Sequence, residues 1–158
     1  MSYHDDLLGH AMDALTRASP SQADLRRSVS TAYYALFHLL ISETVDHWDL
    51  ESSRGALARM FEHSVMRKVS KRVADPKQFP FASNDPVIVQ RLRYVAESFA
   101  QLQYSRQIAD YDNSIIWSLS DARAEVDTAV DAFKAWQSIR HEKIAEDYLV
   151  SLLIKPRD

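Results

Sequence analysis

Cysteine is absent from the 158-residue sequence, and glycine and proline are scarce, with two and five residues. Without cysteine the chain forms no disulfide, has no thiolate for a metal and has no cysteine nucleophile. No run alternates apolar and polar residues between turn signals, so the sequence predicts an all-α fold. No stretch of about eighteen apolar residues occurs, and the start MSYHDDLLGHAMD lacks the basic and apolar regions of a secretory signal. We therefore expect a cytoplasmic protein without a membrane partner.

Neither sign of charge is in large excess, because 19 basic and 22 acidic residues give a formal net charge of −3. This charge produces no general attraction to nucleic acid or to an anionic membrane, so such binding needs a local patch. The six histidines show no spacing typical of a metal site, and no glycine-rich phosphate loop is present. We expect no metal and no cofactor. The length indicates a single domain over residues 1–158.

The stretch LRRSVSTAYYALFHLLI, residues 25–41, organises the predicted fold. Its apolar residues recur at the spacing of one helix face. A second face is also largely apolar, so this helix should be covered on more than one side. Ser21 and Asp24 form a predicted capping box at its start, and the helix should run to about His47. It is predicted to be the central helix of an antiparallel bundle.

The other predicted helices follow from the same spacing. They are residues 3–18, residues 57–73, a helix that starts at Pro86 behind the N-cap Asp85, and a last helix whose N-cap is Ser118 or Ser120. Residues 75–85 have two prolines and no period, so they form the chief loop. One unbroken last helix would be about 50 Å long, so we expect a break near residues 140–142. One core should contain Leu36, Phe37, Phe99, Leu102 and Phe133.

Arg106 interrupts the apolar stripe of the predicted fourth helix. The stripe runs through Leu92, Phe99 and Leu102, and the next position is Arg106, with Asp110 one turn later. A charge that is buried without a partner costs several kcal/mol. We therefore expect the guanidinium to lie within hydrogen-bond reach of Asp110 or Tyr111 and to border a polar cleft.

Three strings carry a family resemblance: RRSVSTAYYALFHLL, YSRQIADYD and FEHSVMRKV. Over most of its length the chain resembles the HEPN domain family, the helical bundles of prokaryotic toxin–antitoxin and defence modules. The resemblance implies an antiparallel four-to-five-helix bundle that forms a homodimer, and partnership with a small nucleotidyltransferase antitoxin. It also implies RNA or a nucleotide as ligand, because many members are metal-independent endoribonucleases. Their motif is an Arg followed, after four to six residues, by a His, contributed by both subunits to a cleft at the dimer interface, so the resemblance implies that the cleft beside Arg106 lies at or near such an interface.

The sequence departs from this motif after Arg106, the residue that matches its Arg. The window that follows, QIADYD, contains no His. The resemblance and the pattern therefore leave Arg106, Asp110 and Tyr111 as candidate catalytic residues, with Asp112 and His38 in reserve. RNA cleavage by transesterification needs a base, an acid and a cation for the phosphorane. Arg106 supplies the cation, but an adjacent Arg lowers the pKa of a carboxylate and makes it a weaker base.

Three functions stay open on these residues. One is a dimeric RNA-binding or ribonuclease-like protein built around Arg106, and another is a non-catalytic HEPN module that binds a nucleotide or a protein partner. The third is a structural adaptor in which Arg106 and Asp110 only pair with each other. A basic row on the third helix, formed by Lys68, Lys71 and Arg72, is either a solvated face or, with Lys77, a set of phosphate contacts.

Overall fold

The structure is a computed structural model that describes residues 2–155. Within these residues it contains seven α-helices, one short 3-10 helix and no strand, so the all-α prediction is confirmed and the predicted count of four to five helices is too low. The elements are α1 (Tyr3–Ala14), α2 (Gln22–Val45), the 3-10 helix η1 (Glu51–Ser53), α3 (Arg54–Ala58), α4 (His63–Ala74), α5 (Pro86–Tyr111), α6 (Leu119–Ile139) and α7 (Lys143–Ser151). None of the helices in residues 2–155 combines the length and apolar character needed to span a bilayer.

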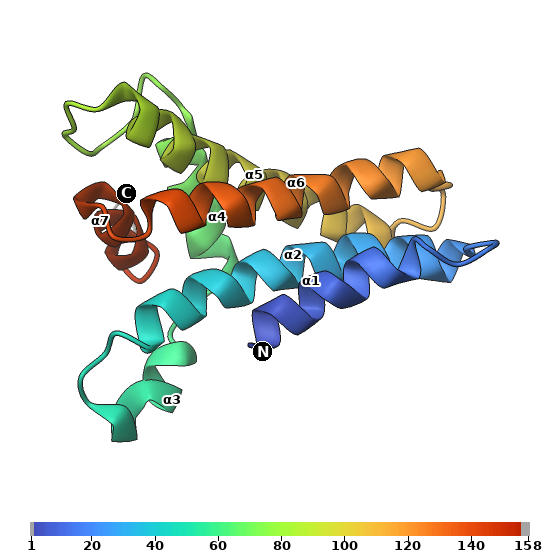
Figure 1. Ribbon diagram of the computed structural model, residues 1–158, viewed down its shortest axis with the longest axis horizontal. Helices are drawn as coiled ribbons and strands as arrows, with labels where there is room; N and C mark the ends of the chain where they lie inside the picture. Colours follow the sequence, from blue (N-terminus) through green and yellow to red (C-terminus); the bar gives the residue numbers. More distant parts are fainter. Residues whose placement is uncertain (1, 156–158) are drawn as a thin grey trace.

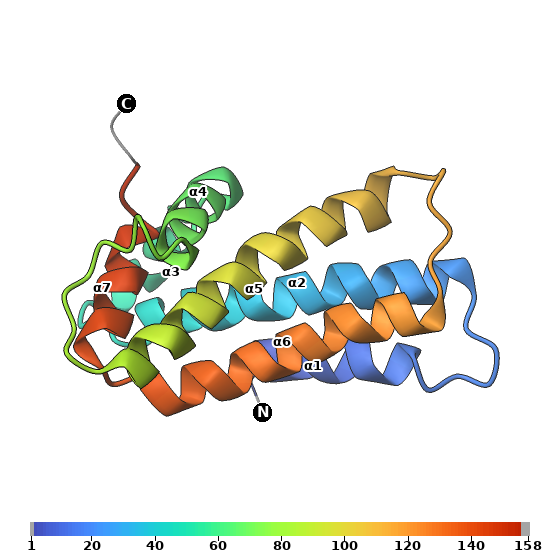
Figure 2. The same cartoon turned by 90° about the horizontal axis from the view of Figure 1, so that it is seen from above.

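Helix α2 is the centre of the bundle, as predicted. It contacts α1, α5 and α6 along its length and reaches α3 and α7 at its C-terminal end. In Figure 1, α1 and α2 lie below α5 and α6, and Figure 2 shows α2 flanked by α5 and α6. Neighbouring long helices run antiparallel, except that α2 and α6 run in the same direction. The predicted core residues belong to one buried cluster, namely Leu36, Phe37, Phe99, Leu102 and Phe133.

The helix ends follow local sequence signals. Ser21 and Asp24 form the predicted capping box of α2. Asp85 accepts hydrogen bonds from the first turn of α5, with Pro86 as the first helical residue. Ser118, rather than Ser120, caps α6. The last helix breaks after Ile139, at the predicted place, and α7 leaves at an angle.

The predicted third helix is wrong as a single element. Residues 59–62 interrupt it, so α3 ends at Ala58 and α4 begins at His63. Neither proline nor glycine lies in this break, and the apolar spacing continues across it. The chain changes direction there because Phe61 is buried in the core, while α3 packs on the end of α2 and α4 packs on α5. The break therefore lets two short helices cover different parts of the bundle.

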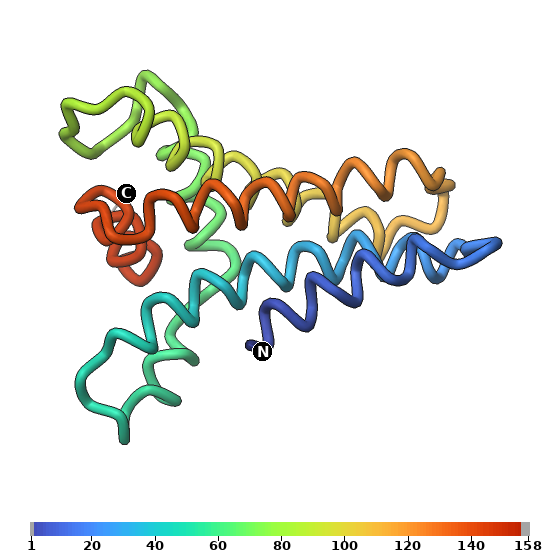
Figure 3. Tube along the Cα trace, in the orientation of Figure 1, coloured from blue at the N-terminus to red at the C-terminus, as the bar shows by residue number. Residues whose placement is uncertain are grey.

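The turns after α1 and after α5 meet at one end of the bundle, on the right of the trace in Figure 3. Side chains from the first turns of α2 hold the second turn in place. Gln22 bonds both the backbone N–H and the carbonyl of Trp117. The Arg26 guanidinium donates to the carbonyls of Ala109, Asp112 and Ile115. The C-terminal end of α5 is thus fixed against α2.

Two polar contacts fix the opposite end of the bundle. A guanidinium nitrogen of Arg140 lies 3.0 Å from a carboxylate oxygen of Glu43, which is buried at the end of α2. The hydroxyls of Ser70 and Tyr148 are 2.7 Å apart, and both side chains are buried. Burial raises the pKa of Tyr148, so this phenol stays protonated at neutral pH. These contacts tie α6 to α2 and α7 to α4.

Arg140→Ala should lower the free energy of unfolding by about 2–3 kcal/mol, because it leaves the buried Glu43 carboxylate without its cation. This loss of stability is smaller than for breaking a fully buried ion pair, because Arg140 is partly exposed. Urea denaturation at pH 7.5 measures the change. The double variant Glu43→Gln/Arg140→Ala, which leaves no stranded charge, should recover part of the loss. Equal stability of wild type and Arg140→Ala contradicts this assignment.

Candidate functional site

Arg106 lies on α5 against the aromatic side of α2. Its side chain is only 12% exposed. The guanidinium carbon Cζ lies 5.4 Å from the ring centroid of Tyr33 and 5.7 Å from that of Tyr34. These distances allow cation–π attraction to both rings. The Nε atom of Arg106 is buried and has no hydrogen-bond partner among residues 2–155, so the protein alone does not satisfy this cation.

Asp110 is the acidic neighbour of Arg106, as predicted, but the contact is looser than expected. The nearest guanidinium nitrogen and carboxylate oxygen are 3.7 Å apart, which is an ion pair but too long for a hydrogen bond. The same carboxylate oxygen accepts a hydrogen bond from the Ser30 hydroxyl at 3.2 Å. The Asp110 side chain is 30% exposed, so it keeps much of its hydration. The predicted hydrogen-bonded pair is therefore a partly solvated ion pair.

His63, the first residue of α4, lies in the same aromatic cluster. Its Nδ1 atom is 2.6 Å from the Tyr33 hydroxyl, and its ring stacks on Phe37 with centroids 4.3 Å apart. The Gln103 amide of α5 donates to the His63 carbonyl at 3.3 Å. Tyr33 thus contacts Arg106 and His63, which come from two different helices.

The environment determines the protonation of these two groups. Burial raises the pKa of Tyr33, and the opposing effect of Arg106 is smaller, so the phenol is neutral. Burial lowers the pKa of His63 from its usual 6.5, and the positive charge of Arg106 and the nearby His38 lower it further. A neutral imidazole has one N–H and one acceptor nitrogen. Among residues 2–155, Nδ1 of His63 is the hydrogen-bond partner of the Tyr33 hydroxyl, so we assign the hydroxyl as the donor and place the proton of the neutral imidazole on Nε2.

The arrangement presents several donors and one cation to an anion. The backbone N–H groups in the first turn of α4 have no partner within the helix, and the N-cap residue Glu62 makes no side-chain cap. The dipole of α4 also favours negative charge at this end. With Arg106 and the Nε2–H of His63, this region is suited to a phosphate. The site offers positive charge and hydrogen-bond donors, and the carboxylates nearest to them in the chain are Asp110, one turn after Arg106, and Glu62, the residue before His63.

The remaining predicted residues lie around this centre in different settings. Tyr111 is 76% exposed at the end of α5. Asp112 accepts hydrogen bonds from the hydroxyl and the backbone N–H of Ser114. These bonds, with Arg26, lower the pKa of the Asp112 carboxyl, which makes it a poor base at neutral pH.

His38 is partly buried between Tyr3 and Phe37, with ring centroids 4.9 and 5.2 Å away. Burial, and secondarily His4, lower the pKa of His38. The rings that contact Arg106 are those of Tyr33 and Tyr34, so His38 belongs to the outer part of the cluster.

His63 is the residue that sequence reasoning missed. It follows no Arg at the family spacing, and it lies on a different helix from Arg106. The only available signal was its place in the string FEHSVMRKV, directly before an amphipathic run. Its proximity to Arg106 depends on how α4 packs against α5.

Comparison of the chain with protein-family models, with curated proteins and with solved structures finds no match in any of the three. The resemblance to the HEPN family therefore remains a prediction that depends on the quoted strings. Within residues 2–155, no three His, Asp or Glu side chains converge as ligands for a metal ion. Arg106, His63 and Tyr33, which contact one another through the Tyr33 side chain, form the candidate site.

The stability of the protein should fall below about pH 6.5, because His63 and His38 hold a proton less tightly in the folded chain than in the unfolded chain. This stabilisation is complete above the unfolded pKa and is lost as the pH falls through the folded pKa. His63→Asn should reduce the difference between urea midpoints at pH 7.5 and 5.5. Tyr33→Phe, which removes the same hydrogen bond but keeps the imidazole, should preserve it. An unchanged difference in His63→Asn contradicts the assignment.

Proposed function

We propose that this protein binds RNA or nucleotides through a phosphate site formed by Arg106 and His63, as a HEPN-like component of a prokaryotic toxin–antitoxin or defence module. The observation that carries the proposal is the contact of one buried ring, Tyr33, with both Arg106 and His63. It places a cation and an imidazole together although they are far apart in sequence. In this proposal His63 stands where the family motif has its His.

Proton positions favour binding over rapid cleavage. A base for the ribose 2′-hydroxyl needs an unprotonated nitrogen, and the Nδ1 atom of His63 is occupied by the Tyr33 hydroxyl. The Nε2–H group is a hydrogen-bond donor to a phosphate oxygen. The Nε2 atom can act as a base only if the imidazole changes tautomer, and this change breaks the hydrogen bond from the Tyr33 hydroxyl. Any metal-independent ribonuclease activity of the isolated chain is therefore expected to be weak.

Arg106→Gln should weaken the binding of adenosine 5′-monophosphate by about tenfold or more, because a charged hydrogen bond to phosphate contributes about 1.5–3 kcal/mol. Isothermal titration calorimetry measures the affinity, with adenosine as the ligand that lacks the phosphate. Arg91→Gln removes the same charge at the exposed far end of α5 and should bind like wild type.

The same variant separates the binding role from a structural role. Loss of the cation–π contacts should lower the free energy of unfolding by about 1–2 kcal/mol. A loss of about 3–5 kcal/mol, as for breaking a fully buried ion pair, is not expected, because Asp110 is partly hydrated. Unchanged nucleotide binding in Arg106→Gln, together with a large loss of stability, assigns the pair to structure and contradicts the proposed function.

A protein partner is favoured by an exposed apolar patch beyond the end of α5. Ile116 is 82% exposed, and the patch consists of Tyr111, Ile115, Ile116 and Leu119. Isolated exposed apolar residues are ordinary, but four of them within nine residues, from the end of α5 to the start of α6, favour an interaction surface. Our proposal includes a symmetric homodimer through this surface. A nucleotidyltransferase antitoxin is the alternative occupant.

Ile116→Asp should convert the dimer into a monomer, because it places a charge at the centre of the buried apolar contact. Multi-angle light scattering at micromolar concentration should give twice the 18.1 kDa chain mass for wild type and one chain mass for the variant. Val87→Asp, at an exposed apolar residue in the first turn of α5, is the matched control and should remain dimeric. A monomeric wild type contradicts the homodimer.

A further inference from the structure

Basic residues are concentrated on α4 and its surroundings. Residues 63–93 contain seven Lys or Arg and only two Asp or Glu, although the whole chain has a net charge of −3. Helix α4 itself has four basic residues and no acidic one. The negative charge is therefore spread over the rest of the molecule, and helix α4 provides the local positive patch that phosphate binding requires.

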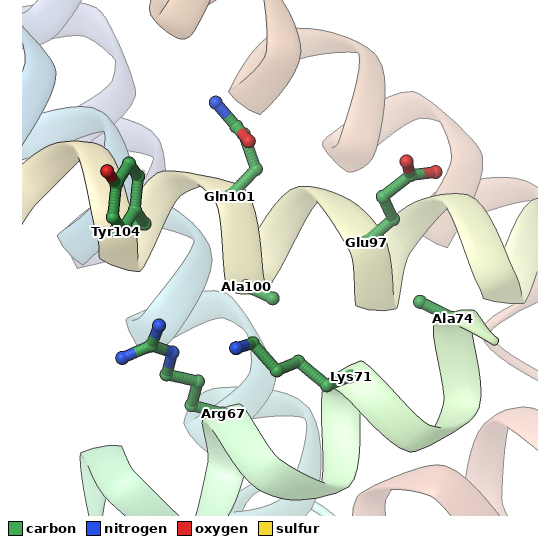
Figure 4. Close-up of a pocket in the computed structure, with 7 residues that line it drawn as sticks. All are labelled: Arg67, Lys71, Ala74, Glu97, Ala100, Gln101 and Tyr104. Atoms are coloured by element: carbon green, nitrogen blue, oxygen red, sulfur yellow. The ribbon is translucent and has the colours of Figure 1, made fainter.

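Part of this patch lines a groove between α4 and α5, with a volume of about 390 Å³. Figure 4 shows Arg67 and Lys71 reaching from α4 toward the stretch of α5 that carries Tyr104. Glu97 and Gln101 extend from α5 away from these two cations in the same view. Gln101 donates instead to Glu125 of α6. The side of the groove formed by α4 is therefore basic.

Within residues 2–155, the cations and the aromatic ring of the groove keep part of their binding capacity unused. The Nε atom of Arg67 is buried and makes no hydrogen bond within residues 2–155. No carboxylate of these residues lies within ion-pair distance of Arg67 or Lys71. Tyr104 is 54% exposed, which leaves ring surface free to stack. Cations beside an exposed aromatic ring are the combination that binds single-stranded nucleic acid.

The groove and the proposed phosphate site share helices α4 and α5. Two hydrogen bonds show that α4 runs antiparallel to α5: Arg93 donates to the carbonyl of Ala74, and Gln103 donates to that of His63. His63, Arg67 and Lys71 are spaced four residues apart and lie on one face of α4. They extend over about 12 Å at 1.5 Å per residue. The two groove cations therefore follow His63 by one and two turns of α4.

We propose that the groove between α4 and α5 binds a single-stranded nucleic acid, with phosphates on Arg67 and Lys71 and an unpaired base stacked on Tyr104. This inference extends the proposed function, since the strand continues to the phosphate site of His63 and Arg106. The ligand is then a polynucleotide, because a single nucleotide at Arg106 fills only part of the surface. A duplex is disfavoured because its bases are already stacked on each other.

Fluorescence anisotropy with a labelled 12-nucleotide single strand tests the groove. Wild type should bind this strand at least about tenfold more tightly than adenosine 5′-monophosphate. Arg67→Gln/Lys71→Gln should weaken binding by tenfold or more and reduce the slope of log K against log salt by about 1.4, or 0.7 per lost phosphate contact. Tyr104→Ala should weaken binding about tenfold, and Tyr104→Phe, which keeps the ring, should restore it.

The matched control is Arg123→Gln/Lys134→Gln, which removes two exposed charges from α6 and should bind like wild type. RNA and DNA strands of one sequence identify the natural ligand, and either supports the groove. Wild-type affinity in the Arg67/Lys71 and Tyr104→Ala variants, or equal affinity for duplex, overturns it. If Arg106→Gln alone then abolishes nucleotide binding, the proposed function stands without the groove. If only the groove variants lose binding, the groove stands and the Arg106 site fails.

Discussion

The buried hydroxyl of Tyr33 requires a hydrogen-bond partner, and the arrangement of the site follows from how that requirement is met. Tyr33 is fully buried at the centre of α2, where an unpaired hydroxyl costs about 1–3 kcal/mol. Its partner is Nδ1 of His63, so the start of α4 is held against α2. The same ring contacts Phe99 in the core and the guanidinium of Arg106. Core packing and the candidate site therefore share one side chain, and a change at Tyr33 affects both.

Local signals in the sequence predicted most of the fold. Ser21 and Asp85 were identifiable as caps because N-capping depends on residues within one turn. The break after Ile139 was predictable because a longer helix would extend beyond the bundle. The break at residues 59–62 was not predictable, because it contains no proline or glycine and depends on Phe61 entering the core. Tertiary packing decided that position against the local pattern.

Half of the candidate site was visible in the sequence. Arg106 was identifiable because a charge on an apolar stripe violates the pattern that burial imposes. His63 gave no such signal, because it precedes the apolar run of α4 and its relation to Arg106 exists only once α4 packs on α5. Asp110 was predicted correctly as a neighbour, yet its hydrogen bond goes to Ser30, a contact between helices that spacing does not reveal.

The unpredicted break before α4 also gives His63 its chemistry. If residues 54–74 formed one helix, His63 would lie in its interior, with its backbone N–H bonded to the preceding turn. At the first position of α4 it instead has free N–H groups beside it and the positive end of the helix dipole. That dipole disfavours a protonated imidazole, in the same direction as burial and Arg106. The helix that begins here carries Arg67 and Lys71 one and two turns later. One short helix therefore sets both the protonation of His63 and the register of the groove cations relative to Arg106.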